Sequence, residues 1–396
     1  MDKMTVRDIE VNGKRVLVRV DFNVSLDEAT GVITDDSRIQ ATLPTIKYLV
    51  DRGAKTILCS HLGQPMGKVV EKLRMAPVAK HLSHLLGQEA KVVGNCIGPD
   101  VEKAVEELKN GEVLILENLR FHPEEERNTD AFAQALSRLA DIYVNDAFGI
   151  SHRMHASTVG ITNYLPAVAG LLVEKEINTL GGILEDPAHP FAALLGGAKI
   201  SDKVGLITHI MDKVDYLLIG GGMAATFLKA KSYETGQSLT EVTMLDIAFN
   251  LMEKASRKGV RLLLPTDVIA VDEIGVKVKT VSIKNISVNS RITDIGPQTI
   301  RNFSQELKRC QTIFWNGPMG ICEIPRFAKG TISMAKLIAS LDAVTIIGGA
   351  STVGIVTEIK LTKRMSFIST GGGASLSYLG GRALPGLELL LEKISN

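Results

Sequence analysis

Short apolar segments alternate with helix-like segments along the whole chain. The apolar segments are rich in Val, Ile and Leu and lack regular apolar–polar alternation, which is typical of strands covered on both faces of a sheet. Strands that alternate with helices predict parallel sheets joined by right-handed crossovers. The predicted strands occupy residues 15–20, 55–60, 112–117 and 142–144 in the first half, and 191–195, 216–219, 261–264, 312–315, 343–347 and 367–369 in the second.

Three segments have apolar residues at the spacing of amphipathic helices, namely 100–109, 130–140 and 171–184. A length of 396 residues indicates two domains. We therefore predict an α/β fold with two doubly wound, Rossmann-like parallel-sheet domains, residues 1–170 and 171–383. The helix at 171–184 opens the second domain and, as a joint between two lobes, suits a hinge motion. The polar segment 271–290 is predicted as strand and loop of no definite form.

Composition narrows the classes of function. The net charge is +1, so a general nucleic-acid or membrane surface is disfavoured, and anion binding requires a local cluster of cations. The four cysteines are widely spaced, which favours buried or incidental thiols over a zinc or redox site. The first residues lack an apolar signal segment, and no run approaches the ~20 apolar residues of a membrane helix, so we expect a cytoplasmic protein.

Polar and basic residues follow the predicted strands of the first half. Asp21, Asn23, His61 and Arg120 stand at strand ends, and Arg38 and Arg153 lie in neighbouring loops. Open parallel sheets bind ligands outside the carboxyl ends of their strands, and arginine binds phosphate and carboxylate through two parallel hydrogen bonds. Each arginine alone is as readily explained by pairing with an acid at the surface. The set as a whole favours an anion site.

Glycines follow the strands of the second half. A glycine turn lets a phosphate approach the backbone, and the next helix offers free N–H groups, although many tight turns also use glycine. Lys199 and Lys203 lie four residues apart at one such turn, where they suit a polyphosphate or form a solvated pair. No P-loop motif is present, and no G-x-G-x-x-G follows the first strand of either half, which disfavours a dehydrogenase.

Long sequence motifs in this chain resemble those of a known protein family. The chain is similar to the phosphoglycerate kinase family over nearly its whole length, in motifs that occur in the family's order. These motifs are VLVRVDFNV (16–24), ITDDSRI (33–39), SHLG (60–63), LENLRFHPEEE (116–126), YVNDAFG (143–149), SHRMHAS (151–157), GGAKISDK (196–203), GGGMAATF (220–227), DIGP (294–297), WNGPMG (315–320) and STGGGAS (369–375).

The resemblance implies an activity and a division of labour. The reaction is reversible phosphoryl transfer between 1,3-bisphosphoglycerate with ADP and 3-phosphoglycerate with ATP, in glycolysis and with Mg²⁺. It implies phosphoglycerate binding by the N-terminal domain and nucleotide binding by the C-terminal one. It also implies that residues 384–396 pack back on the first domain, that the lobes close for transfer, and that the protein is a monomer.

The resemblance further implies roles for individual residues. Catalysis is assigned to Arg38, Lys199, Gly371, Gly372 and Gly373. Phosphoglycerate binding is assigned to Asp21, Phe22, Asn23, Arg38, His61, Leu62, Gly63, Gln64, Arg120 and Arg153. Nucleotide binding is assigned to Lys199, Lys203, Gly220, Gly221, Asn316, Pro318, Glu323, Gly348, Gly349, Ala350, Ser351 and Thr352.

Several positions depart from the family pattern, mostly on the nucleotide side. Ala350 and Ser351 stand where the family usually has glycine and the aspartate that approaches magnesium, and a hydroxyl is a poorer magnesium ligand than a carboxylate. We expect the nucleotide phosphates to hold the metal, with Ser351 as a weak ligand. Ala225, Ile292, Thr293 and Gln64 also depart. Two hypotheses follow: a working kinase with a weaker Mg²⁺–nucleotide site, and a non-catalytic phosphoglycerate-binding homologue.

Overall fold

The computed structural model describes residues 2–27, 29–272, 275 and 277–393. The chain forms two compact units, Met1–Asn178 with Ala383–Asn396, and Thr179–Arg382. The division therefore falls inside helix α6 (Leu171–Glu185), whereas the sequence placed the domain boundary just before this helix. Both units have a parallel main sheet with connecting helices, and this agrees with the predicted two-domain α/β fold.

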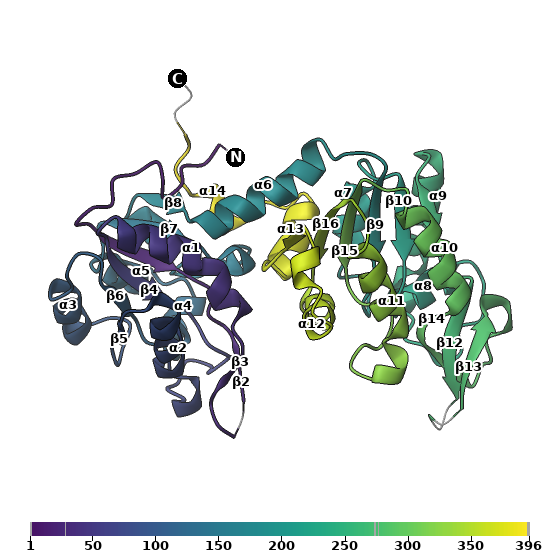
Figure 1. Cartoon of the computed structure of the whole chain (residues 1–396), viewed down its shortest axis with the longest axis horizontal. Coiled ribbons are helices and arrows are strands. Elements are labelled where there is room, and N and C mark those ends of the chain that lie inside the picture. The colour runs from purple at the N-terminus through teal and green to yellow at the C-terminus, as the bar shows by residue number, and fades with distance from the viewer. Residues whose placement is uncertain (1, 28, 273–274, 276, 394–396) are drawn as a thin grey trace. The chain divides into compact units, whose positions relative to one another are not determined.

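The first unit is built on a six-stranded parallel sheet (Figure 1). Its central strands are buried along nearly their whole length, because helices cover both faces, and this explains their continuous apolar sequences. The short edge strands β5 and β8 were not predicted. In spatial order the strands are β5 (Ala90–Val92), β6 (Val113–Ile115), β4 (Lys55–Cys59), β1 (Arg15–Arg19), β7 (Ile142–Asn145) and β8 (Ala167–Ala169).

The helices of the first unit follow ordinary start and stop signals. Helix α2 has proline in its first turn and ends at Gly87, whose left-handed conformation suits glycine. Helix α1 buries Ile39, Ile46 and Leu49 in the core of the unit. The helical segments are α1 (Ser37–Asp51), η1 (Glu71–Leu73), α2 (Ala76–Leu86), α3 (Pro99–Glu106), η2 (Leu119–Phe121), α4 (Pro123–Glu126), α5 (Asp130–Ser137), η3 (Phe148–Ile150), η4 (Gly160–Asn163) and α14 (Pro385–Glu388), beside a hairpin of β2 (Ser25–Leu26) and β3 (Ile33–Asp35).

The two ends of the chain lie along the β8 edge of this sheet (Figure 1). The Met4 amide donates to the Leu391 carbonyl at 2.7 Å, and the Leu391 amide donates to Ala167 at 2.9 Å. The Ala169 amide donates to Met4 at 2.9 Å. These bonds cover an edge strand that would otherwise expose its backbone groups. Of the predicted return segment 384–396, residues 394–396 lie outside the described residues.

The second unit has its own six-stranded parallel sheet. The order along the sheet reverses between β9 and β15, and such a reversal is where doubly wound sheets bind ligands. The observed strands differ from the predicted ones by at most one residue at either end. They are, in spatial order, β11 (Arg261–Leu263), β10 (Tyr216–Ile219), β9 (Phe191–Leu195), β15 (Thr312–Asn316), β16 (Val344–Gly348) and β17 (Phe367–Ile368).

The helices of this unit begin close after the strand ends. Helices α8, α12 and α13 each follow a glycine turn directly, so their first N–H groups face the carboxyl edge of the sheet. The helical segments are α7 (Val204–Ile210), α8 (Met223–Ala230), η5 (Val242–Met244), α9 (Leu245–Arg257), η6 (Ile283–Asn285), α10 (Pro297–Leu307), η7 (Pro325–Phe327), α11 (Lys329–Ile338), α12 (Ala350–Glu358), η8 (Thr362–Arg364) and α13 (Gly373–Leu379).

The segment of undetermined form belongs to a small antiparallel sheet in the second unit. Strands β12 (Asp267–Asp272), β13 (Val278–Ser282) and β14 (Ser290–Ile295) pair in the order β13-β12-β14. Strand β13 is exposed on both faces, so its sequence has no apolar pattern that could have predicted it. Residues 273–274 and 276 of the connection lie outside the described residues.

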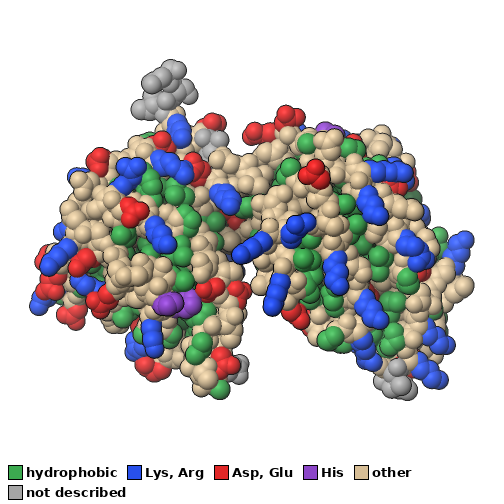
Figure 2. Space-filling model, viewed as in Figure 1, with side chains coloured by type: hydrophobic (Ala, Val, Ile, Leu, Met, Phe, Trp, Pro, Cys, Tyr) green, Lys and Arg blue, Asp and Glu red, His purple; other side chains and the backbone are tan. Residues whose placement is uncertain are grey.

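On the face of the described residues that Figure 2 shows, charged side chains are spread out rather than gathered in one patch. Figure 2 shows lysine and arginine side chains dispersed over the visible face of the second unit and mixed with acidic side chains on the first. Across the described ranges, no helix is long and apolar enough to cross a membrane. Cys59, Cys96 and Cys310 are buried, Cys322 is partly exposed, and all four are free thiols.

A buried aspartate anchors the start of helix α6. Asp146 follows β7, is fully buried, and accepts a 2.9 Å hydrogen bond from the Leu172 amide through Oδ1. Burial raises the pKa of this carboxyl to about 7, and the bonds from Thr45 and Leu172 only partly oppose the rise. The native state therefore holds a proton at pH values where the unfolded chain has lost it.

We predict that Asp146 makes the first unit less stable as the pH rises from about 4 to about 7, because only the native state binds the proton in that range. Asp146→Asn keeps an acceptor for Leu172 and should flatten this dependence, which is on the order of 4 kcal/mol. Urea unfolding of both proteins across this pH range measures it.

Asp141→Asn is the matched control. A hydrogen bond from Arg15 is the main cause that lowers the pKa of Asp141, so its contribution is present above pH 3.8 and is lost only in more acid solution. Equal slopes for wild type and Asp146→Asn between pH 4 and 7 would contradict the prediction.

Candidate functional site

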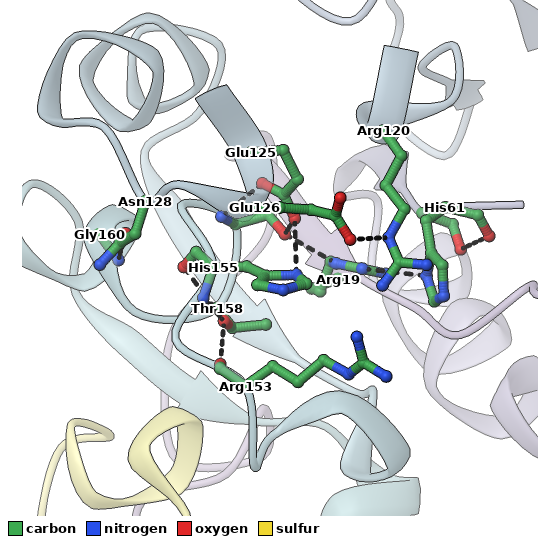
Figure 3. A network of polar contacts seen from close by, with 12 residues as sticks. Arg19, His61, Arg120, Glu125, Glu126, Asn128, Arg153, His155, Thr158 and Gly160 are labelled. Atoms are coloured by element: carbon green, nitrogen blue, oxygen red, sulfur yellow. Dashed lines mark hydrogen bonds and ion pairs between the residues drawn. The ribbon is translucent and has the colours of Figure 1, made fainter. Parts of the chain in front are cut away.

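A cluster of basic side chains lies at the carboxyl edge of the first sheet. Arg38 comes from α1, His61 follows β4, Arg120 lies on η2, and Arg153 follows η3. Burial lowers the pKa of His61 well below its ordinary value, and the charges of Arg19, Arg120 and Arg38 lower it further. Arg153 acts in the same way on Arg120 and on His155. The predicted basic residues are therefore brought together, as Figure 3 shows for His61, Arg120 and Arg153.

Two of these arginines are held by internal partners. Arg38 forms an ion pair with Asp21 through Nη1 and Oδ2. Arg120 is 5% exposed, donates through Nη1 to the Gly63 carbonyl at 3.0 Å, and has Nε 3.1 Å from Glu126 Oε1. Burial lowers the pKa of Arg120 without depriving it of its charge at neutral pH. Arginines fixed in this way present the remaining N–H groups to an anion with little loss of side-chain entropy.

The remaining predicted residues of the first unit differ in what they can contact. Asn23 accepts a 2.8 Å bond from the Gly63 amide and so orders the turn after β4. Phe22 and Leu62 belong to the core, which leaves only their backbone for a ligand. Gln64 is exposed beside this turn and brings no positive charge.

Three glycine turns meet at the carboxyl edge of the second sheet. The Gly197 amide donates to Pro318 at 2.9 Å, and the Gly221 amide donates to Met319 at 3.0 Å. Gly197 and Gly221 have φ of +95° and +64°, and a Cβ on Gly221 would lie 2.6 Å from the Gly197 nitrogen. Only glycine fits such a close approach of backbones. The turns after β9, β10 and β15 therefore form one compact floor.

A pocket of about 550 Å³ opens above this floor. Gly221, Pro318, Glu323 and Ser351 of the predicted nucleotide residues line it. Besides Ser351, three further departures from the family pattern line it, namely Ala225, Ile292 and Thr293. Its wall is mainly apolar, and Arg291, Asp294 and Glu323 are its charged lining residues, a composition typical of sites that bind a small organic molecule.

Other predicted nucleotide residues form a second cluster in the same unit. Lys203 is 6% exposed and donates through Nζ to Asn316 Oδ1. Burial lowers the pKa of Lys203 to about 8. The Asn316 amide nitrogen lies 3.1 Å from the position that a Cβ on Gly348 would take, so the turn of Gly348 and Gly349 adjoins this lysine.

The rest of the predicted set lies outside the pocket lining. Gly220 is buried, and Lys199 is exposed on the turn after β9. The Thr352 hydroxyl accepts a 2.9 Å hydrogen bond from the Gly317 amide. Ala350 begins α12, and Gly371–Gly373 stand at the start of α13. Within the described part of the chain, no group of three or more His, Cys, Asp or Glu residues could hold a metal ion.

Sequence reasoning missed residues that hold these turns in place. Glu241 accepts bonds from the Ile200 amide at 2.6 Å, the Ser201 amide at 3.2 Å and the Ser201 hydroxyl. Burial alone would raise the pKa of Glu241, but the bonds from Ser201 and Ile200 outweigh it and the pKa is lowered. The carboxylate thereby fixes the turn that carries Lys199. A lone glutamate forty residues away gives no signal of this in the sequence.

Two doubly wound units, one with a basic cluster and one with a glycine-floored pocket, are typical of enzymes that act on anionic metabolites. A family model described as Phosphoglycerate kinase matches residues 6–382. The chain belongs to the phosphoglycerate kinase family, and its activity is phosphoryl transfer.

Individual relatives agree with this assignment. The chain is 51% identical to the phosphoglycerate kinase of Moorella thermoacetica, over 99% of this chain and 100% of that one. It is 52% identical to that of Dictyoglomus turgidum, over 98% of each chain. The solved phosphoglycerate kinase of Coxiella burnetii has a TM-score of 0.86 at 38% identity, covering 98% of both chains. That of Pyrococcus horikoshii has a TM-score of 0.83 at 32% identity, with the same coverage.

We predict that Glu241→Ala weakens ADP binding about tenfold, because three donors lose their acceptor and the turn that carries Lys199 loses its fixed geometry. Calorimetry with ADP and Mg²⁺ measures the affinity. Ser201→Ala, which removes only the hydroxyl bond, is the graded control and should cost about threefold or less. Equal ADP affinity in wild type and Glu241→Ala would show that the turn keeps its geometry without this carboxylate.

Proposed function

We propose that the basic cluster of the first unit binds phosphoglycerate and that the pocket of the second unit binds the adenine nucleotide of the phosphoglycerate kinase reaction. The observation that carries this division is the coexistence of clustered arginines on one sheet and glycine turns on the other. Arginines recognise phosphate and carboxylate, whereas glycine turns at helix starts recognise polyphosphate. We further propose that the protein is a cytoplasmic monomer.

The proposed roles of the residues in the first unit depend on their charge and on their place at the carboxyl edge of the sheet. Arg120 and Arg153 attract the anionic ends of phosphoglycerate, and Asp21 and Asn23 stand at the strand end where the substrate hydroxyl is to be held. Arg38 faces the transferring group. The acceptor is a carboxylate that is ionised at pH 7, since such groups titrate near ~4, so no general base is required.

The second unit supplies cations and N–H groups to the moving phosphoryl group. Lys199 follows this group, Lys203 holds nucleotide phosphates beside Asn316, and the N–H groups of Gly371–Gly373 face the transition state. Glu323 accepts a hydrogen bond from the ribose. Transfer needs in-line positioning and positive charge around a loose transition state, and domain closure would align the groups and exclude water.

Magnesium, when bound with the nucleotide, neutralises charge on the phosphates during transfer. Ser351 lies in the pocket lining and offers one neutral oxygen, so the phosphate oxygens and water must complete the coordination. The residues present therefore fit a metal carried by the nucleotide rather than one held by a protein cage.

The non-catalytic alternative has no supporting observation in the fold or in the comparisons. A coupled assay with 1,3-bisphosphoglycerate and ADP tests the proposal directly. Steady ATP formation that is lost in Lys203→Met supports it. Normal phosphoglycerate binding with no turnover in wild type would instead support the binding homologue.

We predict that Ser351→Asp tightens binding of Mg²⁺ with ADP, by about tenfold, because a carboxylate replaces a hydroxyl near the metal. Calorimetric titrations with ADP, in the presence and absence of Mg²⁺, distinguish an effect on metal binding from repulsion between the new carboxylate and the ADP phosphates. Without Mg²⁺ the added negative charge should weaken ADP binding. An affinity for Mg²⁺ with ADP that does not change would place Ser351 away from the metal.

The lowered pKa of Lys203 predicts a pH dependence of nucleotide binding. The free lysine loses its charge as the pH rises through about 8, where ADP is already fully ionised, so ADP affinity should fall between pH 7 and 9.5. Fluorescence or calorimetric titrations at each pH measure this fall. In Lys203→Met the affinity should be lower at pH 7 and nearly independent of pH. A variant that keeps the wild-type slope would assign the dependence to another group.

A further inference from the structure

Beneath the basic cluster lies an arginine that the substrate site leaves unexplained. Arg19 is on β1 and is 1% exposed, so it cannot contact a ligand at the edge of the sheet. Figure 3 shows its side chain between His61 on one side and the glutamates after η2 on the other. A desolvated guanidinium persists only where its donors are satisfied, so its partners indicate what it does.

All three nitrogens of this guanidinium have acceptors. Arg19 Nε donates to the Ser157 hydroxyl at 2.8 Å, Nη1 donates to the Val20 carbonyl, and Nη2 lies 3.2 Å from His61 Nδ1. A guanidinium has donors only and remains protonated in proteins. His61 Nδ1 must therefore accept, and a proton on this imidazole resides on Nε2. Within the described residues, Nε2 makes no hydrogen bond to protein.

Ser157 connects Arg19 to the loop that carries Arg153. Its hydroxyl donates to Glu125 Oε1 at 2.6 Å, its amide donates to Glu125 Oε2 at 3.0 Å, and its carbonyl accepts from the Tyr143 hydroxyl at 2.8 Å. Glu125 is fully buried, and so is Ser157. The Ser157 hydroxyl thus links the buried Arg19 guanidinium to the buried Glu125 carboxyl, and these hydrogen bonds restrict the position of the guanidinium.

We propose that Arg19 is a positioning residue for the reaction: it fixes His61 as the neutral imidazole with its proton on Nε2, so that His61 meets the substrate anion as a hydrogen-bond donor. The inference rests on the proposed function, which places His61 in the phosphoglycerate site. It differs from the usual expectation for a histidine among phosphate-binding arginines, namely that it adds a further cation.

The strongest electrostatic influences on His61 favour the neutral ring. Arg19 on β1, Arg120 on η2 and Arg38 on α1 present positive charge to it, and His155 approaches from the loop after η3. Burial adds to the cost of a charged ring, and together these groups hold the pKa of His61 well below 6.5. After burial, the groups that act most strongly on His61 are three arginines and a second histidine, and each of them lowers its pKa.

Nitrogen NMR of the full-length protein tests the tautomer directly. Long-range ¹H–¹⁵N spectra resolve the ring nitrogens of the eight histidines, and the spectrum of His61→Gln assigns the His61 signals. The expected result is a protonated Nε2 and an unprotonated Nδ1 that do not titrate between about pH 5.5 and 8. A protonated Nδ1, or titration in this range, would overturn the proposal whether or not the protein is active.

Arg19→Met removes the donors while keeping an unbranched apolar side chain, and Arg15→Met is its matched control on the same strand. Arg15 pairs with Asp141 at the surface, at 2.6 Å, outside the site. In Arg19→Met, His61 should titrate closer to 6.5 and exchange between tautomers, and the KM for phosphoglycerate should rise about tenfold or more. The ratio of the variant KM to the wild-type KM should fall below pH 6.5, where only the variant gains a cation. A flat ratio would overturn the proposal.

If Arg19→Met fails to fold, two substitutions of His61 itself test which ring nitrogen donates to the substrate. Glutamine places its amide donor near the position of Nε2, whereas asparagine places it near Nδ1. His61→Gln should therefore retain several-fold more phosphoglycerate affinity than His61→Asn, and the reverse order would contradict the proposal. Absence of turnover in wild type would count against the proposed function and leave the NMR result intact.

Discussion

Every strand of both main sheets runs parallel, and this constraint determines where chemistry can occur. In a parallel sheet all the turns that follow the strands open at one edge, so residues distant in sequence meet there. In the first unit this brings residues after β1, β4, β6 and β7 together, and in the second it brings the turns after β9, β10 and β15 together. One edge collects arginines and the other collects glycines.

The same constraint explains what the sequence could predict. Strands buried on both faces are continuous apolar runs, and their ends are visible as changes to glycine or polar residues, so β9 (Phe191–Leu195) and β10 (Tyr216–Ile219) were predicted to the residue. Exposed or very short strands leave no such signal: β13 (Val278–Ser282) was predicted only within a strand-and-loop segment of no definite form, and β5 (Ala90–Val92) was missed. The strand ends, where many of the predicted site residues stand, were therefore the positions that the sequence located best.

The supporting residues could not be predicted, because their partners are set by tertiary contacts alone. Asp294 was part of a recognised motif, yet its role emerges only from the fold: it accepts bonds from the Gly330 amide at 2.7 Å and the Ile295 amide at 2.9 Å. A Cβ on Gly320 would lie 2.5 Å from its carboxylate. This buried acid thus joins β14 to the start of α11, and Gly320 is glycine to make room for it.

The supporting acids also determine which backbone donors remain for a ligand. Each N–H group at the start of a helix or turn can bind either a carboxylate of the protein or a phosphate of the nucleotide. Glu241 occupies the amides of Ile200 and Ser201, and Asp294 occupies that of Gly330. Lys203 can therefore meet a phosphate with its charge uncompensated by these acids, since neither of them acts on it and burial is the main cause of its lowered pKa. The proposed anion site of the second unit therefore depends both on which backbone donors internal carboxylates already occupy and on which cations these carboxylates leave free.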